Sequence, residues 1–199
     1  MSYMDRKNIL SEGFFDFLRK IPKDLKFMNS MERKLYKKDP EFRKDMDSIG
    51  NIIKKLDLKI PDMPTPIANY VPFKVADNTV YVSGQGPVID GKILYSGKVG
   101  VDISEEEGIK AAESCCINII AALKTSIDGD WDRLDSFLKL GGFVNCNDNF
   151  TNQPKIINGA SDLLVNIFGD KGRHSRFAVG SNALPLNISV EIDAIIKIK

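Results

Sequence analysis

Apolar and polar residues alternate most regularly near the carboxyl-terminal end of the chain, in two runs separated by residues 182–187. A period of two is typical of a β-strand that buries one face. In the second run the apolar face consists of Ile188, Val190, Ile192, Ala194, Ile196 and Ile198. The short break between the runs contains Pro185. The pattern therefore predicts an antiparallel hairpin whose second strand is part of the core.

In the first run the alternation predicts that Phe177 and Val179 face the core and that Arg176 faces the other way. The hairpin register then brings Arg176 close to Glu191, at a cross-strand distance of about 5 Å. A nearby cation favours the charged form of a carboxyl, so we expect Glu191 to stay ionised at neutral pH. The pair fits a ligand site, but from pairing alone the preferred interpretation is an ordinary ion pair on a solvated face, which contributes little to stability.

The segments before this hairpin also show the patterns of regular elements. Asp77-Asn78 is a turn pair between two β-branched and aromatic runs, and Ser104-Glu-Glu-Glu107 is a capping box that opens an amphipathic helix of roughly twenty residues. The expected elements are strands at 69–76 and 79–83, a short strand at 98–101, the helix from 104, a strand at 134–144 and a helix between Pro154 and Gly169.

This order predicts an α+β fold, in which a mixed sheet of about six strands carries two helices on one face. The other face of the sheet is partly apolar and has no element to cover it. Self-association of the chain is therefore expected.

Composition divides the 199 residues into two parts. Residues 1–62 are net basic, have helical periodicity and end in a Pro-rich linker, whereas residues 63–199 are net acidic and hold the predicted sheet. We expect two or three short helices in the first part. Acidic residues mixed among the basic ones disfavour binding to nucleic acid or to a membrane surface, so an arm that packs on its own oligomer or on another partner is the preferred interpretation.

The few cysteines and the single histidine limit the possible chemistry. Three Cys and one His give neither a secreted disulfide framework nor the usual zinc site, so we expect no metal and a reducing, cytoplasmic location. No apolar run is long enough for a membrane span. Gly84 and Gly86 follow a predicted strand, but Pro87 comes next, and the pattern of a dinucleotide-binding loop is not met. No cofactor is expected.

Two motifs carry a family resemblance. Arg176, Leu184-Pro185 and Val190-Glu191-Ile192, in that order and spacing, resemble the signature of the Rid family of reactive-intermediate deaminases, also called the YjgF or L-PSP endoribonuclease family. Ser83-Gly-Gln-Gly-Pro87 is similar to the Ser-Gly-Gln-x-Pro turn of that family. The resemblance covers residues 67–198. It implies a chorismate-mutase-like fold assembled as a homotrimer, whose three sheets close into a barrel with ligand pockets between neighbouring subunits.

The resemblance also implies an activity, the hydrolytic deamination of enamine or imine intermediates of 2-amino acids to 2-keto acids and ammonia. Arg176 would clamp the substrate carboxylate and Glu191 would act on the attacking water. Tyr70, Ser83 and Gly84 would line the pocket.

Several positions depart from the family pattern, and one is Asn182, where the family prefers a small or basic residue. Ala178 replaces a cysteine that many members have, which excludes covalent chemistry there, and His174 stands where the family prefers Pro or Ala. Two alternatives remain open. The chain is also compatible with a non-catalytic protein that binds or senses carboxylate metabolites, and with an endoribonuclease, although the acidic domain argues against a nucleic-acid partner.

Overall fold

The computed structural model describes residues 37–41, 48–61, 63 and 69–199. The chain forms two compact units, Met1–Lys59 and Ile60–Lys199. In the first unit, helix α4 spans Ile49–Lys55 and begins at Ser48, whose hydroxyl accepts a hydrogen bond from the backbone N–H of Asn51. The helical periodicity predicted for the start of the chain lies outside the described residues.

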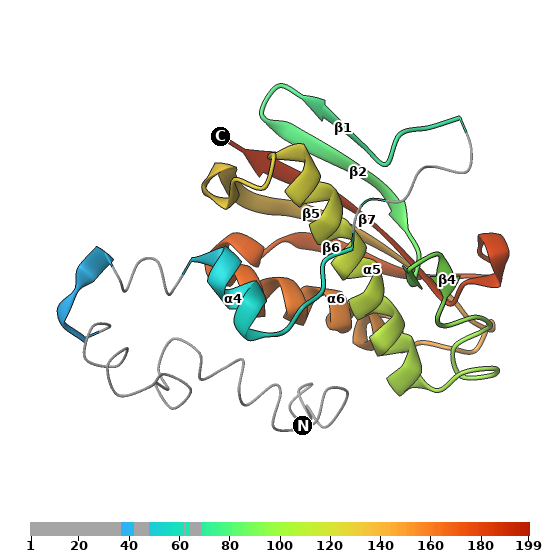
Figure 1. Cartoon of the computed structure of the whole chain (residues 1–199). Coiled ribbons are helices and arrows are strands. Elements are labelled where there is room, and N and C mark those ends of the chain that lie inside the picture. Colours follow the sequence, from blue (N-terminus) through green and yellow to red (C-terminus); the bar gives the residue numbers. More distant parts are fainter. Residues whose placement is uncertain (1–36, 42–47, 62, 64–68) are drawn as a thin grey trace. The chain divides into compact units, whose positions relative to one another are not determined.

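Five strands of the second unit form one mixed sheet, in the order β1–β2–β7–β5–β6 (Figure 1). The strands are β1 (Phe73–Ala76), β2 (Thr79–Gln85), β5 (Leu134–Asn145), β6 (Ser175–Ser181) and β7 (Val190–Ile198). β5 and β6 pair in parallel, and the other neighbours pair antiparallel. A separate small sheet joins β3 (Val88–Ile89) to β4 (Lys92–Ile93). At 98–101, where a short strand was expected, only isolated bridges at Val99 form.

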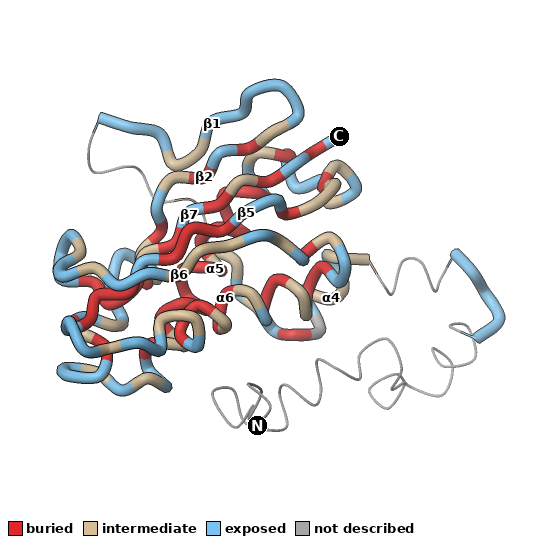
Figure 2. The backbone as a smooth tube through the Cα atoms, turned by 180° about the vertical axis from the view of Figure 1, so that it is seen from behind, coloured by how far each residue is buried: buried red, intermediate tan, exposed pale blue. Residues whose placement is uncertain are grey.

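Helices α5 (Glu105–Ser126) and α6 (Gln153–Phe168) cover one face of this sheet, which confirms the predicted α+β class. Figure 2, seen from behind, shows the strands in front of both helices. The capping box of Ser104 and Glu107 forms as predicted, and α6 ends at Gly169, whose φ of 59° suits glycine. Three short 3-10 turns complete the unit, η2 (Trp131–Arg133), η3 (Gly169–Gly172) and η4 (Pro185–Asn187).

The core lies between the sheet and the two helices. All six residues of the apolar face predicted for 188–198 are buried, so β7 takes a central position in the sheet. Gly159 permits the close approach of α6 to α5, because a side chain there would meet the backbone carbonyl of Ile109. No helix in the described ranges is both long and apolar enough to cross a bilayer.

The predicted hairpin of the last two strands is wrong. β5 lies between β6 and β7, and β6 instead runs parallel to β5 after the α6 crossover. The connection between β6 and β7 is an irregular turn in which Leu186 and Asn187 adopt left-handed φ values of 55° and 54°. The physical reason is burial: β7 is apolar along its whole core face and takes the sheet centre, whereas β6 carries Arg176 and Gly180 and suits the edge.

The predicted orientation of β6 is also wrong. Phe177 and Val179 face the side of the sheet that no helix of the second unit covers, where Phe177 packs edge-on against Phe143 with ring centroids 5.3 Å apart. Arg176 faces α6, to which its guanidinium is hydrogen-bonded. The alternation was read correctly, but the apolar residues of β6 belong to the open face rather than to the core. We call this helix-free side of the sheet the open face.

Candidate functional site

A hollow of about 360 Å³ lies on the open face, where β2, β5, β6 and β7 meet. It is lined by Gly84, Phe143, Ser181, Leu184, Glu191 and Asp193. The register explains this grouping, because Glu191 pairs with Phe143, and Phe143 pairs with Val179 on the next strand. The hollow thus combines two carboxyl groups with one aromatic ring, one aliphatic side chain and one hydroxyl.

Glu191 lies directly against Gly84. The pairing of β2 with β7 is irregular between Val82 and Gln85, and this bulge exposes Gly84. A Cβ at position 84 would collide with the carboxylate of Glu191, so only glycine leaves room for that side chain. The sequence placed Gly84 and Glu191 in one site, and the structure brings these two residues together.

The electrostatic surroundings of Glu191 differ from the expectation. Burial raises the pKa of Glu191, and the neighbouring Asp193 raises it further. Arg176 does not lie beside this carboxyl, so the prediction that a cation keeps Glu191 ionised is wrong. None of the residues that line the hollow is a cation. A carboxyl whose pKa moves toward neutrality can both accept and return a proton.

Arg176 belongs to a different cluster, between β6 and α6. Its Nη1 donates to Ser161 Oγ at 2.9 Å and its Nη2 donates to the carbonyl oxygen of Pro154 at 3.1 Å. Arg176 pairs with Leu140, three positions before the row that contains Val179, Phe143 and Glu191. An odd number of positions along a strand separates the two faces of a sheet, so within one chain Arg176 and Glu191 point to opposite sides.

His174 completes the Arg176 cluster. Its Nε2 lies 2.9 Å from Ser161 Oγ and its Nδ1 lies 2.7 Å from the carbonyl oxygen of Gly172. Burial lowers the pKa of His174, the hydrogen bond with Gly172 opposes this effect, and the charge of Arg176 lowers the pKa further. The imidazole is therefore neutral at neutral pH.

Ser83 lies in β2, and Tyr70 comes before β1. Ser83 Oγ donates to the carbonyl oxygen of Val71 at 2.7 Å, which ties the segment after Tyr70 to β2. Tyr70 is 51% exposed, and neither residue is among those that line the hollow.

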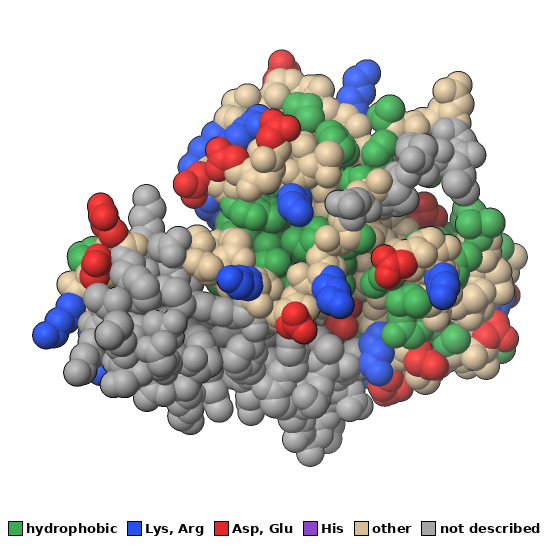
Figure 3. Space-filling view, in the orientation of Figure 1, with side chains coloured by type: hydrophobic (Ala, Val, Ile, Leu, Met, Phe, Trp, Pro, Cys, Tyr) green, Lys and Arg blue, Asp and Glu red, His purple; other side chains and the backbone are tan. Residues whose placement is uncertain are grey.

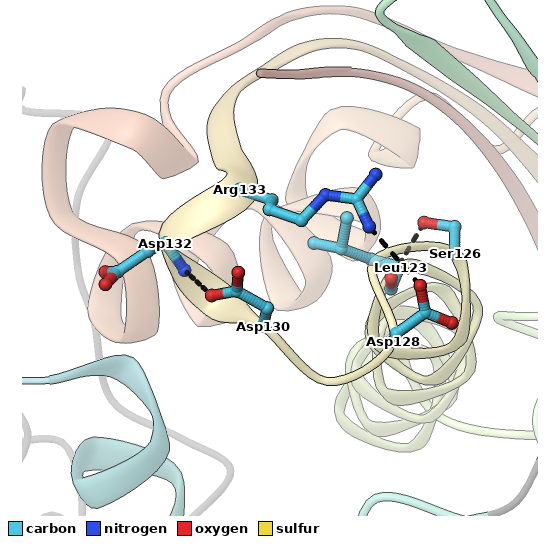
Figure 4. Close-up of polar contacts among 6 residues, drawn as sticks. All are labelled: Leu123, Ser126, Asp128, Asp130, Asp132 and Arg133. Atoms are coloured by element: carbon cyan, nitrogen blue, oxygen red, sulfur yellow. Dashed lines mark hydrogen bonds and ion pairs between the residues drawn. The ribbon is translucent and has the colours of Figure 1, made fainter.

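A second concentration of acidic residues, Asp128, Asp130 and Asp132, lies in the turn after α5 (Figure 4). Asp128 pairs with Arg133 at 3.4 Å, and Asp130 accepts a hydrogen bond from the backbone N–H of Asp132 at 3.1 Å. The three carboxylates point in different directions. Across the described part of the chain, no three His, Cys, Asp or Glu side chains converge on a possible metal position.

The comparisons with known proteins agree with this fold. Residues 52–195 match the model of a family described as YjgF/chorismate mutase-like, putative endoribonuclease. The chain belongs to this family. It is also similar to Protein TCP17 of Trypanosoma cruzi, with 36% identity over 147 residues. This match covers 73% of the chain and 91% of TCP17.

Two solved structures are similar to this member of the Rid, or YjgF, family. The protein Atu1372 of Agrobacterium tumefaciens, of unknown function, is 43% identical, with a TM-score of 0.73 over 80% of the chain and 98% of its own length. A putative endoribonuclease from Shewanella oneidensis MR-1 is 32% identical, with a TM-score of 0.72 over 75% of the chain and 99% of its own length. The resemblance inferred from the motifs is thereby confirmed.

Sequence reasoning missed several residues that the structure places at the two clusters. Asp193 is two positions after Glu191, and strand periodicity puts both carboxyls on one face, but only Glu191 was assigned to the site. Phe143 lines the hollow from β5, and Ser161 and His174 contact each other around Arg176. No local pattern reports these contacts, because they depend on the order of strands in the sheet.

Proposed function

We propose that the protein hydrolyses reactive 2-imino and enamine acids to 2-keto acids and ammonia, as a cytoplasmic enzyme without a metal or cofactor. The observation that carries this proposal is the half-buried carboxyl of Glu191, which lies at the edge of a small hollow with a raised pKa and no described hydrogen-bond partner. A carboxyl of this kind is suited to transfer protons to and from water near neutral pH.

The same proposal includes a site shared between copies of the chain. A 2-imino acid carries a carboxylate, and the hollow beside Glu191 offers two carboxyl groups and no cation. Arg176 is suited to bind a carboxylate with its planar fork, but it lies on the other side of the sheet. A homotrimer would allow Glu191 of one copy and Arg176 of a neighbour to act on one substrate.

Exposed apolar side chains support assembly through the open face. Tyr81, Phe143 and Val179 are 49%, 39% and 43% exposed, and all three lie on this face. Neighbouring apolar side chains of this size on a sheet face are typical of a surface that is covered in an assembly. The proposed trimer buries them and brings the carboxyl of Glu191 close to a second copy.

The chemistry then requires only proton transfer. The oxygen of a water molecule attacks C2 of the protonated imine while the Glu191 carboxylate takes one proton from the water, which gives a neutral carbinolamine. Glu191 returns that proton to the amine nitrogen. The C–N bond then breaks as the hydroxyl proton passes back to the Glu191 carboxylate, so that the C2 carbonyl forms and ammonia leaves. Ammonia takes the last proton from Glu191, which restores the carboxylate. Burial aids both steps, because a raised pKa brings proton gain and proton loss closer to balance.

An endoribonuclease is less well supported, although the family description and the Shewanella relative carry that name. Cations and acids of the described residues alternate on the face shown in Figure 3, and no continuous basic area forms there. Binding to a phosphate backbone depends on such an area.

Subunit mixing tests the proposed function and the shared site together. A dehydratase generates 2-aminoacrylate or 2-iminobutyrate, and the decay of the imine is followed with and without this protein. Arg176→Ala and Glu191→Gln should each lose most of the activity, Glu191→Gln by about 100-fold. After subunit exchange, an equal mixture of the two variants should recover about a quarter of the parent activity. In about a quarter of the interfaces, one subunit supplies a native Glu191 and its neighbour supplies a native Arg176.

The outcomes of this experiment are separable. If the parent protein does not hasten imine decay, the deaminase assignment fails and a binding or sensing role takes its place. If the parent is active but the mixture shows no recovery, while native mass spectrometry confirms subunit exchange, the shared site is wrong.

A further inference from the structure

His174, Ser161 and Arg176 form one chain of hydrogen bonds that the proposed reaction does not yet use. It begins at the carbonyl oxygen of Gly172, passes through the imidazole and the hydroxyl, and ends at the guanidinium. His174 is also one of the positions at which the sequence departs from the family pattern. All members of this network are at least half-buried or backbone. They come from η3, α6, β6 and the loop between η3 and β6, which holds His174.

The direction of each hydrogen bond follows from the groups involved. A carbonyl oxygen only accepts, so Nδ1 of His174 carries the proton that it donates to Gly172. In the neutral imidazole Nε2 is then an acceptor, and the hydroxyl of Ser161 donates to it. The remaining lone pair of Ser161 Oγ accepts from Arg176. All these donors and acceptors are satisfied by one proton arrangement.

This arrangement fixes the guanidinium at two points. Nη1 is held by Ser161 and Nη2 by the carbonyl oxygen of Pro154 in the first turn of α6. Two attachments on different nitrogens define the plane of a guanidinium, and bidentate binding of a carboxylate depends on that plane. Removal of either attachment lets the fork rotate.

We propose that Ser161 and His174 are positioning residues that hold the guanidinium of Arg176 in the plane required to clamp a substrate carboxylate. The inference rests on the proposed function, because it concerns the same arginine. The proposal also gives His174 a role in pH dependence, because the imidazole and the guanidinium both contact the hydroxyl oxygen of Ser161. Binding of a carboxylate at Arg176 is therefore linked to protonation of His174.

The sign of this linkage follows from the charges. Arg176 disfavours protonation of His174, and a bound carboxylate offsets that positive charge, so ligand binding raises the pKa of His174 and takes up protons. Other charged groups on the elements packed around the imidazole are Lys155 and Asp162 on α6 and the residues Asp170, Lys171 and Arg173 at η3. Lys155 pairs with Glu105 at 2.6 Å. Asp170 and Arg173 pair with each other at 3.1 Å, and Lys171 donates to the carbonyl oxygen of Leu134.

Pyruvate binding to the full-length protein, measured by calorimetry near neutral pH, tests the positioning role. Ser161→Ala should weaken the affinity about tenfold, as expected for loss of a hydrogen bond to a charged group. Ser161→Thr keeps the hydroxyl and should bind as the parent does. Ser114→Ala is the matched control, because Ser114 is also a mid-helix serine, but its hydroxyl donates only to the carbonyl oxygen of Lys110.

His174 is tested through the protons exchanged on binding. In two buffers of different ionisation enthalpy at about pH 6, the parent should take up protons when pyruvate binds. In His174→Gln the side chain can still accept the hydrogen bond from Ser161, but it does not titrate. This variant should therefore keep the affinity for pyruvate and lose the proton uptake that is due to His174. Glu191 titrates as well, and its share remains in both proteins. His174→Ala should lose affinity and proton uptake together.

Each outcome decides a different point. If Ser161→Ala binds pyruvate as tightly as the parent while Arg176→Ala does not, the positioning role is wrong and the clamp stands. If Arg176→Ala also binds as the parent does, the clamp of the proposed function is wrong, and this inference falls with it. Equal proton uptake by the parent and by His174→Gln overturns the link to His174.

Discussion

The two clusters on opposite faces of the sheet differ in how completely one chain builds them. Around Arg176, one chain supplies the cation, its two attachment points and the imidazole behind them. Around Glu191, one chain supplies a carboxyl and a hollow, but no described partner for the charge. The Arg176 cluster is thus preorganised before any ligand binds, whereas the Glu191 cluster is complete only with something added. That difference is what a site divided between copies requires.

The largest effect is expected at Arg176. Arg176→Lys should weaken pyruvate or 2-ketobutyrate binding by about 100-fold or more. The ammonium group of lysine has neither the planar geometry of the guanidinium nor its two hydrogen bonds to Ser161 and Pro154. Isothermal titration measures the affinity, and sedimentation checks that the assembly is unchanged. Parent-like binding by Arg176→Lys would show that no bidentate clamp exists at this position.

Glu191 should affect chemistry more than binding. Glu191→Gln keeps the size of the side chain but removes the base, so imine hydrolysis should fall by about 100-fold with ligand affinity nearly unchanged. The coupled dehydratase assay gives the rate, and calorimetry gives the affinity. Unchanged hydrolysis would leave Glu191 with a structural role only.

Gly84→Ala should alter the Glu191 cluster and leave the Arg176 cluster intact. The new methyl group would occupy the space of the Glu191 carboxylate and displace it, which should lower hydrolysis by about tenfold or more, since misplacement of a catalytic group is costly. Gly91→Ala is a control on the same domain, because nothing lies within 4 Å of a Cβ at position 91, although its φ of 74° adds backbone strain. Equal activity of Gly84→Ala and the parent would separate Glu191 from catalysis.

The contrast between the clusters also explains how far the sequence could be interpreted. Helix boundaries depend on neighbours in sequence, so the capping box at Ser104 and the glycine at 169 were located correctly. The alternation of β7 was equally informative, because all its apolar positions serve one core. Gly84 and Glu191 were assigned to one site by family resemblance, and they do lie in contact.

The error at Arg176 has a physical origin. Strand periodicity states which residues share a face, but not which face is buried or which strands are neighbours. Phe177 and Val179 are apolar because the open face is itself partly apolar, and the insertion of β5 between β6 and β7 follows from contacts distant in sequence. Ser161 and His174 could not be found for the same reason.

The smallest expected effect is on stability, where the two clusters should respond to pH with opposite signs. The pKa of Glu191 in the folded protein is raised above its ordinary value of 4.5, so the folded state binds more protons than the unfolded state. The stability that this group contributes is complete below pH 4.5 and is lost as the pH rises through its folded-state pKa. The pKa of His174 is lowered below 6.5, so its contribution is complete above 6.5 and is lost as pH falls through the folded value. Both side chains are partly exposed, so each contribution should be less than about 1 kcal/mol. Urea unfolding as a function of pH should therefore give two different results. Glu191→Gln should reduce the loss of unfolding free energy as the pH rises, and His174→Gln should reduce the loss as the pH falls. The same change in both variants would mean that the clusters are not electrostatically independent.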